Sequence, residues 1–287
     1  MKNRENRAKV VFINDELIEE DAYLWRYIDL QKFLSFIFSK SLYLARFDKF
    51  EDNKEGITLK HLYFLKQKKE IENNPIFDKI KSYISLEVSG DKMNKIDEEL
   101  KEIQEFNFAN CWVLGNFNSE SVAMWNLYSQ PNSLAIKIKY SDFKENLIKY
   151  GVNYYDESTQ IICSPITYID FQNPSHSTIK NIINNSVFIK DKSFEHEKEF
   201  RIVAREKVKE KPEVHYKKNI YKGNIERIHN EMWNYVGIEL ILNEFENYNF
   251  EIVHHPKSQN WAKKNIEEIL KLTGINFNVN ESNLELR

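Results

Sequence analysis

The sequence predicts a single α+β domain over residues 1–287, with a charged helical insertion over residues 58–106. Stretches with the alternation typical of strands and stretches with helical spacing of apolar residues both occur along the chain. No repeat or low-complexity linker divides it. With 41% hydrophobic and 14% aromatic residues, the chain can bury a substantial core.

The first unit is expected to be a strand, a helix and a second strand. Residues 23–27 indicate the first strand, and Asp29 is placed to cap a helix whose apolar face begins at Leu30. The second strand, over residues 42–45, leads into an acidic loop over residues 47–53. The insertion of residues 58–106 follows this loop.

The remaining elements follow the insertion in an order typical of a sheet with few helices. Strands are expected around residues 111–114, 134–138, 166–169, 199–204 and 237–242, and a helical turn over residues 123–128. A helix over residues 261–272 is expected to end at Gly274. Residues 275–280 alternate apolar side chains with Asn, which predicts a strand with one solvated face.

Bulk properties exclude several classes of protein. The formal net charge of −3 gives no overall attraction to nucleic acid or to an anionic membrane. No apolar run approaches the ~18 residues of a membrane span, and the first residues lack the apolar stretch of a secretory signal. The two cysteines, Cys111 and Cys163, have no metal-ligand spacing and suit a reducing compartment. We therefore expect a cytoplasmic protein with no membrane partner. There is no glycine-rich phosphate loop.

The most informative stretch places three charged residues at every second position. Glu197, Glu199 and Arg201 would share one face of a strand, with neighbours roughly 7 Å apart, while Phe200 and Ile202 anchor the core. Such a row forms either a solvated outer face or the wall of a site.

Arg26 is the candidate anion-binding residue. It stands between Trp25 and Tyr27 in the first strand, and a guanidinium suits a phosphate or carboxylate. The alternative is an ordinary ion-paired Arg, with Glu199 as one candidate partner.

Two further groups are candidates for a ligand site. Asp48, Glu51 and Asp52 follow a strand end and suit Mg²⁺, although a solvated loop contains the same residues. Trp125, Tyr128 and Ser129 can form a stacking wall for a nicotinamide or nucleobase, or part of the core. His254 and His255 are adjacent, and no third ligand is placed beside them, so no metal site is predicted there.

These segments resemble a bacterial family known as domain of unknown function 2971 (DUF2971). The residues that carry the resemblance are Trp25-Arg26-Tyr27, Phe47-Asp48-Lys49-Phe50-Glu51-Asp52, Met124-Trp125-Asn126-Leu127-Tyr128 and Phe194 through Arg201. Four motifs occur in the family's order and cover most of the chain. Phe194 stands where the family has Trp, and Lys49 where it has Pro or Asp. The resemblance implies relatives but no reaction.

The order of elements is also similar to that of ADP-ribosyltransferase-like domains. This similarity implies a central mixed or antiparallel sheet that is split around helices. It further implies an early Arg that binds the NAD pyrophosphate, aromatic side chains that stack on the nicotinamide and a late Glu that holds the ribose. Arg26, Tyr128 with Trp125, and Glu199 with Glu197 as an accessory carboxylate match those positions, and Tyr27 and Ser129 lie beside them.

We therefore expect an NAD-consuming toxin or phage-defence effector. Its acceptor would be an unidentified protein or nucleic acid. A partner protein of the defence system could regulate it. One alternative is a Mg²⁺-dependent nuclease in which Asp48, Glu51 or Asp52 acts with Glu197 and Glu199. Another is a non-catalytic sensor that binds a partner through residues 58–106.

Overall fold

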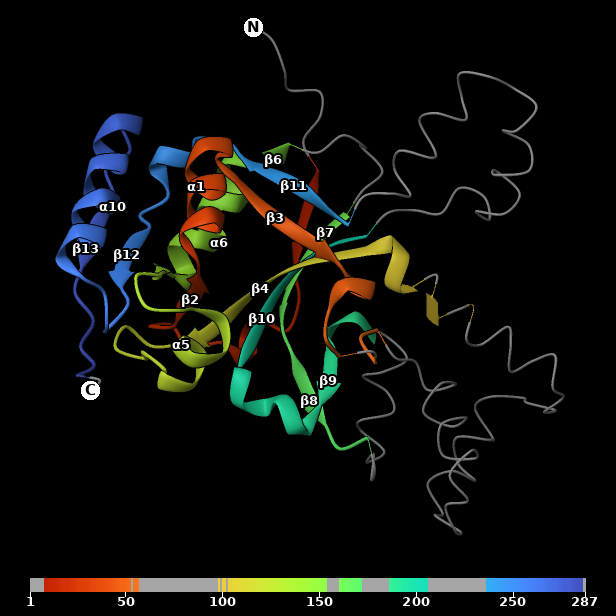
Figure 1. Cartoon of the computed structure of the whole chain (residues 1–287). Helices are drawn as coiled ribbons and strands as arrows, with labels where there is room; N and C mark the ends of the chain where they lie inside the picture. Colours follow the sequence, from red (N-terminus) through yellow and green to blue (C-terminus); the bar gives the residue numbers. More distant parts are fainter. Residues whose placement is uncertain are drawn as a thin grey trace, which may run out of the picture.

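A computed structural model describes the part of the chain that forms the sheet and its covering helices (Figure 1). The described residues are 8–52, 54–56, 98, 100, 101, 103–153, 160–171, 186–205 and 236–285. Most of the predicted insertion, residues 58–106, lies outside them. Its described residues, 98, 100, 101 and 103–106, are helical.

A large mixed sheet forms the centre of the molecule, which confirms the α+β class (Figure 1). Its main path runs through β1 (Lys9–Phe12), β7 (Gln160–Pro165), β10 (Glu199–Arg205), β4 (Asn107–Gly115), β2 (Tyr23–Ile28), β5 (Leu134–Lys139), β12 (Glu251–His254) and β13 (Asn278–Asn280). Off this path lie β3 (Ser41–Arg46), β11 (Gly237–Leu242) and β6 (Val152–Asn153). The pairs β1–β7 and β12–β13 are parallel, and the other pairs of this sheet are antiparallel.

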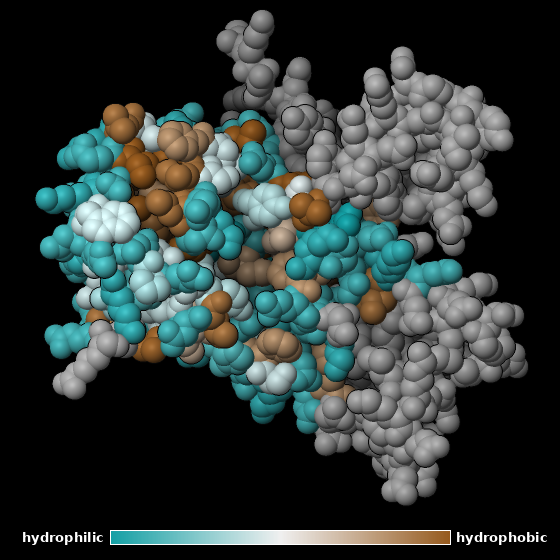
Figure 2. Space-filling model, viewed as in Figure 1, coloured by the Kyte–Doolittle hydropathy of each residue, from teal (hydrophilic) through white to brown (hydrophobic). Residues whose placement is uncertain are grey.

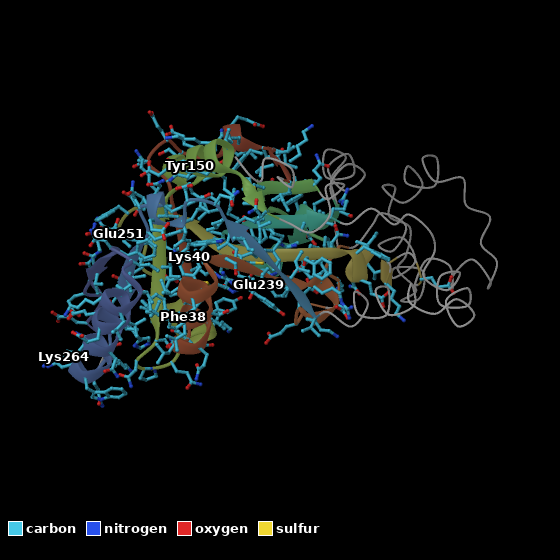
Figure 3. All side chains as sticks on the ribbon, turned by 90° about the horizontal axis from the view of Figure 1, so that it is seen from above. Phe38, Lys40, Tyr150, Glu239, Glu251 and Lys264 are labelled. Carbon is cyan, nitrogen blue, oxygen red and sulfur yellow. The ribbon has the colours of Figure 1, made fainter. Side chains whose placement is uncertain are left out.

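Helices lie on the sheet where the sequence supplies caps and apolar faces. They are α1 (Leu30–Ser39), α5 (Val122–Tyr128), α6 (Tyr140–Tyr150) and α10 (Asn260–Thr273). As predicted, Asp29 caps α1, accepting a hydrogen bond of 2.8 Å from the Lys32 amide. Gly274 ends α10 with a φ of 68°, in the left-handed region that favours glycine. Seen from above, α10 forms one end of the molecule, with Lys264 on its outer side (Figure 3).

A second, two-stranded sheet lies beside β10. It consists of β8 (Thr167–Ile169) and β9 (Ile189–Asp191), which are parallel. Short 3₁₀ helices surround both sheets: η1 (Asp15–Leu17), η2 (Phe47–Lys49), η3 (Ser186–Phe188), η4 (Lys192–Glu197) and η5 (Phe245–Asn247). In Figure 1 the small sheet lies to the right of the start of β10.

Strand β2 separates two apolar clusters because its side chains alternate between its faces. Leu24 and Ile28 belong to the main core, together with residues of α1, α6 and α10. Trp25 and Tyr27 point the other way and pack with Met124 and Trp125 of α5. Both faces of β2 are therefore covered, and its path is fixed on either side of Arg26.

Most of the predicted strands and helices are present, with three differences. Thr167–Ile169 is a strand but pairs with β9 outside the central sheet. The final strand is shorter than predicted: Asn278–Asn280 pair with β12, whereas Ile275 and Phe277 pack in the main core ahead of the paired residues. Sequence periodicity did not predict α6 or the strands β1, β6, β7, β9 and β12.

Glu197 is not part of a strand with Glu199 and Arg201, so the predicted row of three charges is wrong in part. Glu197 ends η4, and Lys198 follows it with a left-handed φ of 43° before β10 begins at Glu199. The remaining pair is buried, with Arg201 fully enclosed and Glu199 5% exposed, so the row is no solvated outer face. Among the described residues, no helix is long and apolar enough to span a membrane.

Candidate functional site

The central sheet is split where β2 and β3 share one edge of β4. Strand β3 pairs with β4 at Ala45↔Ala109, and β2 pairs with β4 from Trp25↔Val113 onward. The β4 residues between these positions, 110–112, have register partners only in β10. The two strands therefore diverge from β4 toward α1, which connects them.

A cavity of about 560 Å³ lies in this split, within the size range of small-molecule sites. Residues of β2, α1, β3 and β4 line it, together with α5, β9, η4 and the start of β10. The face seen in Figure 2 is hollowed near its centre, where apolar residues form the floor and hydrophilic residues surround it. Segments that are distant in the sequence therefore line the same cavity.

Side chains of β4 connect the strands that border the split. Asn110 donates from Nδ2 to the carbonyl of Tyr43 in β3 at 2.7 Å, and Trp112 donates from Nε1 to Oδ1 of Asn110 at 2.6 Å. The Arg26 guanidinium carbon lies 5.9 Å from the centroid of the Trp112 ring. These contacts fix the positions of both diverging strands relative to the floor of the cavity.

Arg26 lines the cavity without an anionic partner. In the described part of the chain, its guanidinium makes neither a hydrogen bond nor an ion pair, and the proposed pair with Glu199 does not form. Burial lowers the pKa of Arg26 to about 10, so the side chain stays charged at neutral pH. A partly buried cation with free donors that faces a cavity provides a binding point for an anionic group.

On the opposite side of the cavity, Arg201 is held between two carboxylates. It contacts Glu199 at 2.6 and 3.0 Å and Glu55 at 2.9 and 3.1 Å, and Nη1 also donates to the carbonyl of Val187 at 2.9 Å. The rings of Phe47 and Phe50 lie 5.3 and 5.7 Å from its guanidinium carbon. Arg201 is therefore an internal cation behind the cavity wall.

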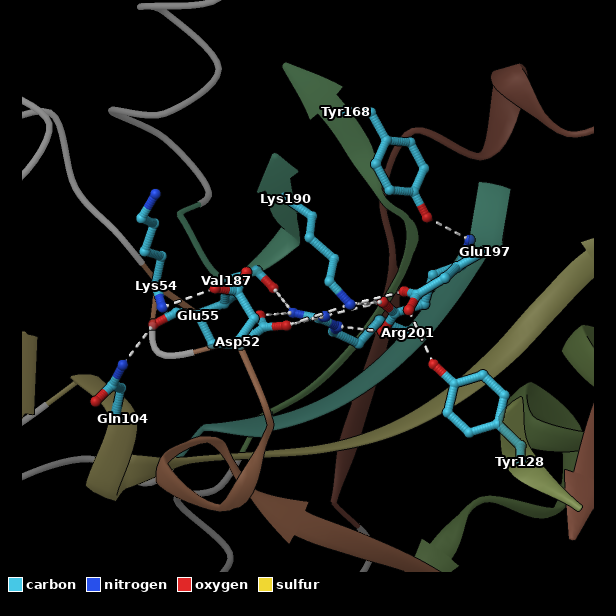
Figure 4. Close-up of polar contacts among 11 residues, drawn as sticks. Asp52, Lys54, Glu55, Gln104, Tyr128, Tyr168, Val187, Lys190, Glu197 and Arg201 are labelled. Atoms are coloured by element: carbon cyan, nitrogen blue, oxygen red, sulfur yellow. Dashed lines mark hydrogen bonds and ion pairs between the residues drawn. The ribbon is translucent and has the colours of Figure 1, made fainter. Parts of the chain in front are cut away.

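Lys190 forms the second cation of this wall (Figure 4). Its Nζ lies 2.7 Å from Glu197, 3.5 Å from Glu199 and 3.6 Å from Glu55. Burial disfavours the charged ammonium, but the nearby carboxylates outweigh this and raise the pKa of Lys190. We call Glu55, Lys190, Glu197, Glu199 and Arg201 the acidic cluster, because its three carboxylates exceed its two cations.

Two tyrosine hydroxyls also contact the acidic cluster. Tyr128 of α5 donates to Oε1 of Glu197 at 2.8 Å, and the hydroxyl of Tyr168 accepts from the amide of Glu199 at 2.7 Å (Figure 4). Burial and the charge of Glu197 raise the pKa of Tyr128, so it acts as a donor at neutral pH. Tyr128 therefore connects α5 with η4 beside the cavity.

The buried carboxylates differ in protonation behaviour. For Glu199, burial favours the protonated form, but Arg201 and Lys190 outweigh it and lower the pKa. For Glu55, burial prevails over its contact with Arg201 and raises the pKa. Glu199 is therefore the firmly ionised member of this pair.

The structure places the sequence candidates in two groups. Seven line the cavity: Arg26, Tyr27, Glu51, Asp52, Tyr128, Glu197 and Glu199. Four do not: Asp48, Trp125, Ser129 and Arg201.

Packing and hydrogen bonds explain why Asp48, Trp125 and Ser129 do not line the cavity. Asp48 is paired with Arg46 and Lys49, and Ser129 donates to the carbonyl of Trp125. Trp125 is fully buried, with its ring 4.7 Å from that of Tyr27. Trp125 therefore supports the cavity wall from behind and makes no contact with the cavity.

Sequence reasoning missed Lys190 and Glu55. Lys190 follows three apolar residues, Val187 to Ile189, and a Lys that directly continues a buried run needs a partner. Glu55 lies at the end of the acidic loop and carries no distinguishing signal. Its role depends on Arg201, which is 146 positions away in the sequence.

The fit to a divalent metal is poor in the described part of the chain, where no group of three His, Cys, Asp or Glu side chains is arranged as ligands. Asp52 accepts a hydrogen bond from the Lys54 amide at 2.9 Å, and Glu55, Glu197 and Glu199 are bound to cations. The acidic residues of this cavity therefore interact mainly with protein donors.

Comparisons of the chain with family models, with curated proteins and with solved structures found no match in any of the three. The function therefore has to be argued from the cavity itself.

Proposed function

We propose that the protein binds NAD in the split cavity and transfers or releases its ADP-ribose, as an ADP-ribosyltransferase-like toxin or phage-defence effector. One observation carries the proposal. Arg26 and the carboxylates of Glu197 and Glu199 line the same cavity, yet they are not each other's counter-ions. Space and charge are thus available on both sides for a ligand with an anionic part and a hydroxyl-bearing part.

The two sides of the cavity suit different parts of NAD. The guanidinium of Arg26 provides paired donors for a phosphate. The acidic cluster provides carboxylate oxygens for ribose hydroxyls, and its excess of negative charge stabilises positive charge that develops on the ribose carbon as nicotinamide leaves. Tyr128, 48% exposed at the cavity, provides an aromatic surface for stacking.

Binding and turnover of NAD test this proposal. Purified protein is titrated with NAD by calorimetry, and nicotinamide release is measured with and without cell extract that supplies acceptors. We expect Arg26→Gln to weaken binding at least tenfold and Glu199→Gln to abolish release. The matched control is Arg205→Gln, which removes an Arg outside the cavity. The proposal is refuted if the wild type does not bind NAD and releases no more nicotinamide than Glu199→Gln does.

A Mg²⁺-dependent nuclease is the second candidate, because Glu51, Asp52, Glu197 and Glu199 line one cavity. We rank it lower because the ammonium of Lys190 and the guanidinium of Arg201 lie against Glu197 and Glu199 and would repel a divalent cation, whereas they do not repel a neutral ribose hydroxyl. Cleavage of DNA or RNA that requires Mg²⁺ and is lost in Asp52→Asn would favour it over the transferase.

A further inference from the structure

The split cavity reaches both faces of the central sheet. Arg26 lies two positions from Leu24, a residue of the main core, so its side chain leaves β2 on the core face. Glu199 precedes Phe200, which also belongs to the main core, so its side chain leaves β10 on the opposite face. Because Arg26 and Glu199 both line the cavity, a ligand that contacts both lies in the break of the sheet, beside residues 110–112 of β4.

Charged side chains are separated by sign along this cavity. The carboxylates that line it come from the loop after η2, from η4 and from the start of β10: Glu51, Asp52, Glu55, Glu197 and Glu199. Lys49 and Lys190 lie among them, and each is paired with a carboxylate, at 3.0 and 2.7 Å. In the part formed by β2 and α1, the charged residues of the described chain that line the cavity are Arg26 and Lys32. An anionic group is therefore drawn toward α1 and away from the carboxylates.

Lys32 and Ser35 lie on one side of α1, because residues three apart are neighbours on a helix surface. Both line the cavity from exposed positions. The ammonium of Lys32 is paired with Asp29 at 3.2 Å, and because both side chains are exposed to solvent, this pair contributes little to stability. The Ser35 hydroxyl has no hydrogen-bond partner among the described residues. A cation and a hydroxyl are thus available to a ligand in the same part of the cavity as Arg26.

We infer that Lys32 and Ser35 bind a second phosphate next to the phosphate that Arg26 holds, so that the cavity accepts a diphosphate. The inference deepens the proposed function and rests on it for the identity of that diphosphate as NAD. The Lys32 side chain is 65% exposed, whereas Arg26 lies over the ring of Trp112 within the split. From the carboxylates to α1, the ligand therefore presents a ribose to Glu199, one phosphate to Arg26 and the other phosphate to Lys32.

The first experiment uses inorganic ions and needs no NAD. Inorganic pyrophosphate and inorganic phosphate are titrated by calorimetry into the wild type, Lys32→Gln, Ser35→Ala and Arg26→Gln at low ionic strength. We expect pyrophosphate to bind the wild type more tightly than phosphate. Lys32→Gln should weaken pyrophosphate binding about fivefold and change phosphate binding less than about twofold. Ser35→Ala should weaken pyrophosphate binding about twofold, and Arg26→Gln should weaken the binding of both ions.

Lys271→Gln is the matched control for this titration. Lys271 belongs to α10, has an i,i+3 carboxylate partner in Glu268 and is 67% exposed at its side chain, but it does not line the split cavity. It should leave the binding of both ions unchanged, and Lys32→Arg, which keeps the charge, should retain pyrophosphate binding. Pyrophosphate that binds the wild type no more tightly than phosphate, or an equal loss in Lys32→Gln and Lys271→Gln, would overturn the inference.

The second experiment compares NAD with nicotinamide mononucleotide, which carries a single phosphate. In assays of nicotinamide release, Lys32→Gln should raise KM for NAD about fivefold, leave kcat unchanged and leave KM for the mononucleotide within about twofold, because only NAD has a phosphate that reaches Lys32. Arg26→Gln should raise KM for both substrates. An equal rise in KM for NAD and for the mononucleotide in Lys32→Gln would contradict a second phosphate at α1.

The two experiments separate the inference from the proposed function. Binding of pyrophosphate that depends on Lys32, together with no NAD turnover by the wild type, would refute the transferase and leave the diphosphate subsite intact. NAD turnover by the wild type with the same KM in Lys32→Gln would retain the transferase and refute the subsite.

Discussion

The two sides of the cavity satisfy their charges in opposite ways. On the side of β10 and β9, Glu55, Glu199 and Arg201 bind one another in a buried network. On the side of β2, the contact of the Arg26 guanidinium within the described part of the chain is the ring of Trp112. A network that is satisfied internally contributes to folding and fixes geometry, whereas an unpaired cation beside open space contributes little to folding. From this comparison we propose the side of β2 as the place where a ligand would supply the missing charge.

The largest expected effect comes from Arg201, the centre of the paired side. Arg201→Met removes the hydrogen-bonded cation of Glu55 and Glu199 and leaves both buried with Lys190 at 3.6 and 3.5 Å, so we expect the free energy of unfolding to fall by about 3–5 kcal/mol. Urea unfolding followed by circular dichroism measures it. Arg205→Met, on the same strand, is the control; it loses one hydrogen bond to Asn107 and no ion pair to a buried carboxylate, so it should lower stability by about 1 kcal/mol or less. A loss below about 1 kcal/mol for Arg201→Met would show that the network does not support the fold.

Arg26 should show the opposite pattern. Arg26→Gln removes a desolvated cation that has no carboxylate partner among the residues that the structure describes, so the free energy of unfolding should change by no more than about 1 kcal/mol in either direction. Binding of NAD should weaken at least tenfold in the same variant. Denaturation and calorimetry on one preparation give both values. A stability loss as large as that of Arg201→Met would show that Arg26 has a structural partner. The contrast between the paired Arg201 and the unpaired Arg26 would then no longer hold.

The paired side should also make the fold sensitive to acid. The pKa of Glu199 lies below its ordinary value of 4.5, because Arg201 and Lys190 outweigh burial. Its contribution to stability is therefore present above about pH 4.5 and is lost as the pH falls through the lower value in the folded state. We expect the unfolding free energy of the wild type to drop over that range and that of Glu199→Gln to drop less steeply. If the unfolding free energy of the wild type and that of Glu199→Gln fell equally with pH, the lowered pKa of Glu199 would be contradicted.

The sequence predicted local structure well and contacts between distant segments poorly. Asp29 and Gly274 mark helix ends through interactions within a few residues, so both were predictable. The period of the chain near Glu199 predicted a strand, but only the left-handed turn at Lys198 shows that Glu197 lies outside it. Glu55 and Lys190 acquire their roles from Arg201 and Glu197 through the folded arrangement of the loop after η2, β9, η4 and β10. The cavity itself depends on β2 and β3 sharing an edge of β4, and no local pattern encodes that.

The smallest expected effect tests whether an unsatisfied polar group by itself indicates a site. The hydroxyl of Tyr248 is buried in the main core and has no hydrogen-bond partner among the described residues. Like Arg26, this hydroxyl lacks a partner among the described residues, but unlike Arg26, Tyr248 does not line the split cavity. Tyr248→Phe should therefore leave NAD binding unchanged and raise the free energy of unfolding by up to about 1 kcal/mol, because the buried hydroxyl no longer has to be desolvated. Thermal unfolding and calorimetry of this variant beside Arg26→Gln measure both quantities. A weaker affinity for NAD in Tyr248→Phe would mean that missing partners do not distinguish the cavity from the core, and the argument for Arg26 would then rest on its position alone.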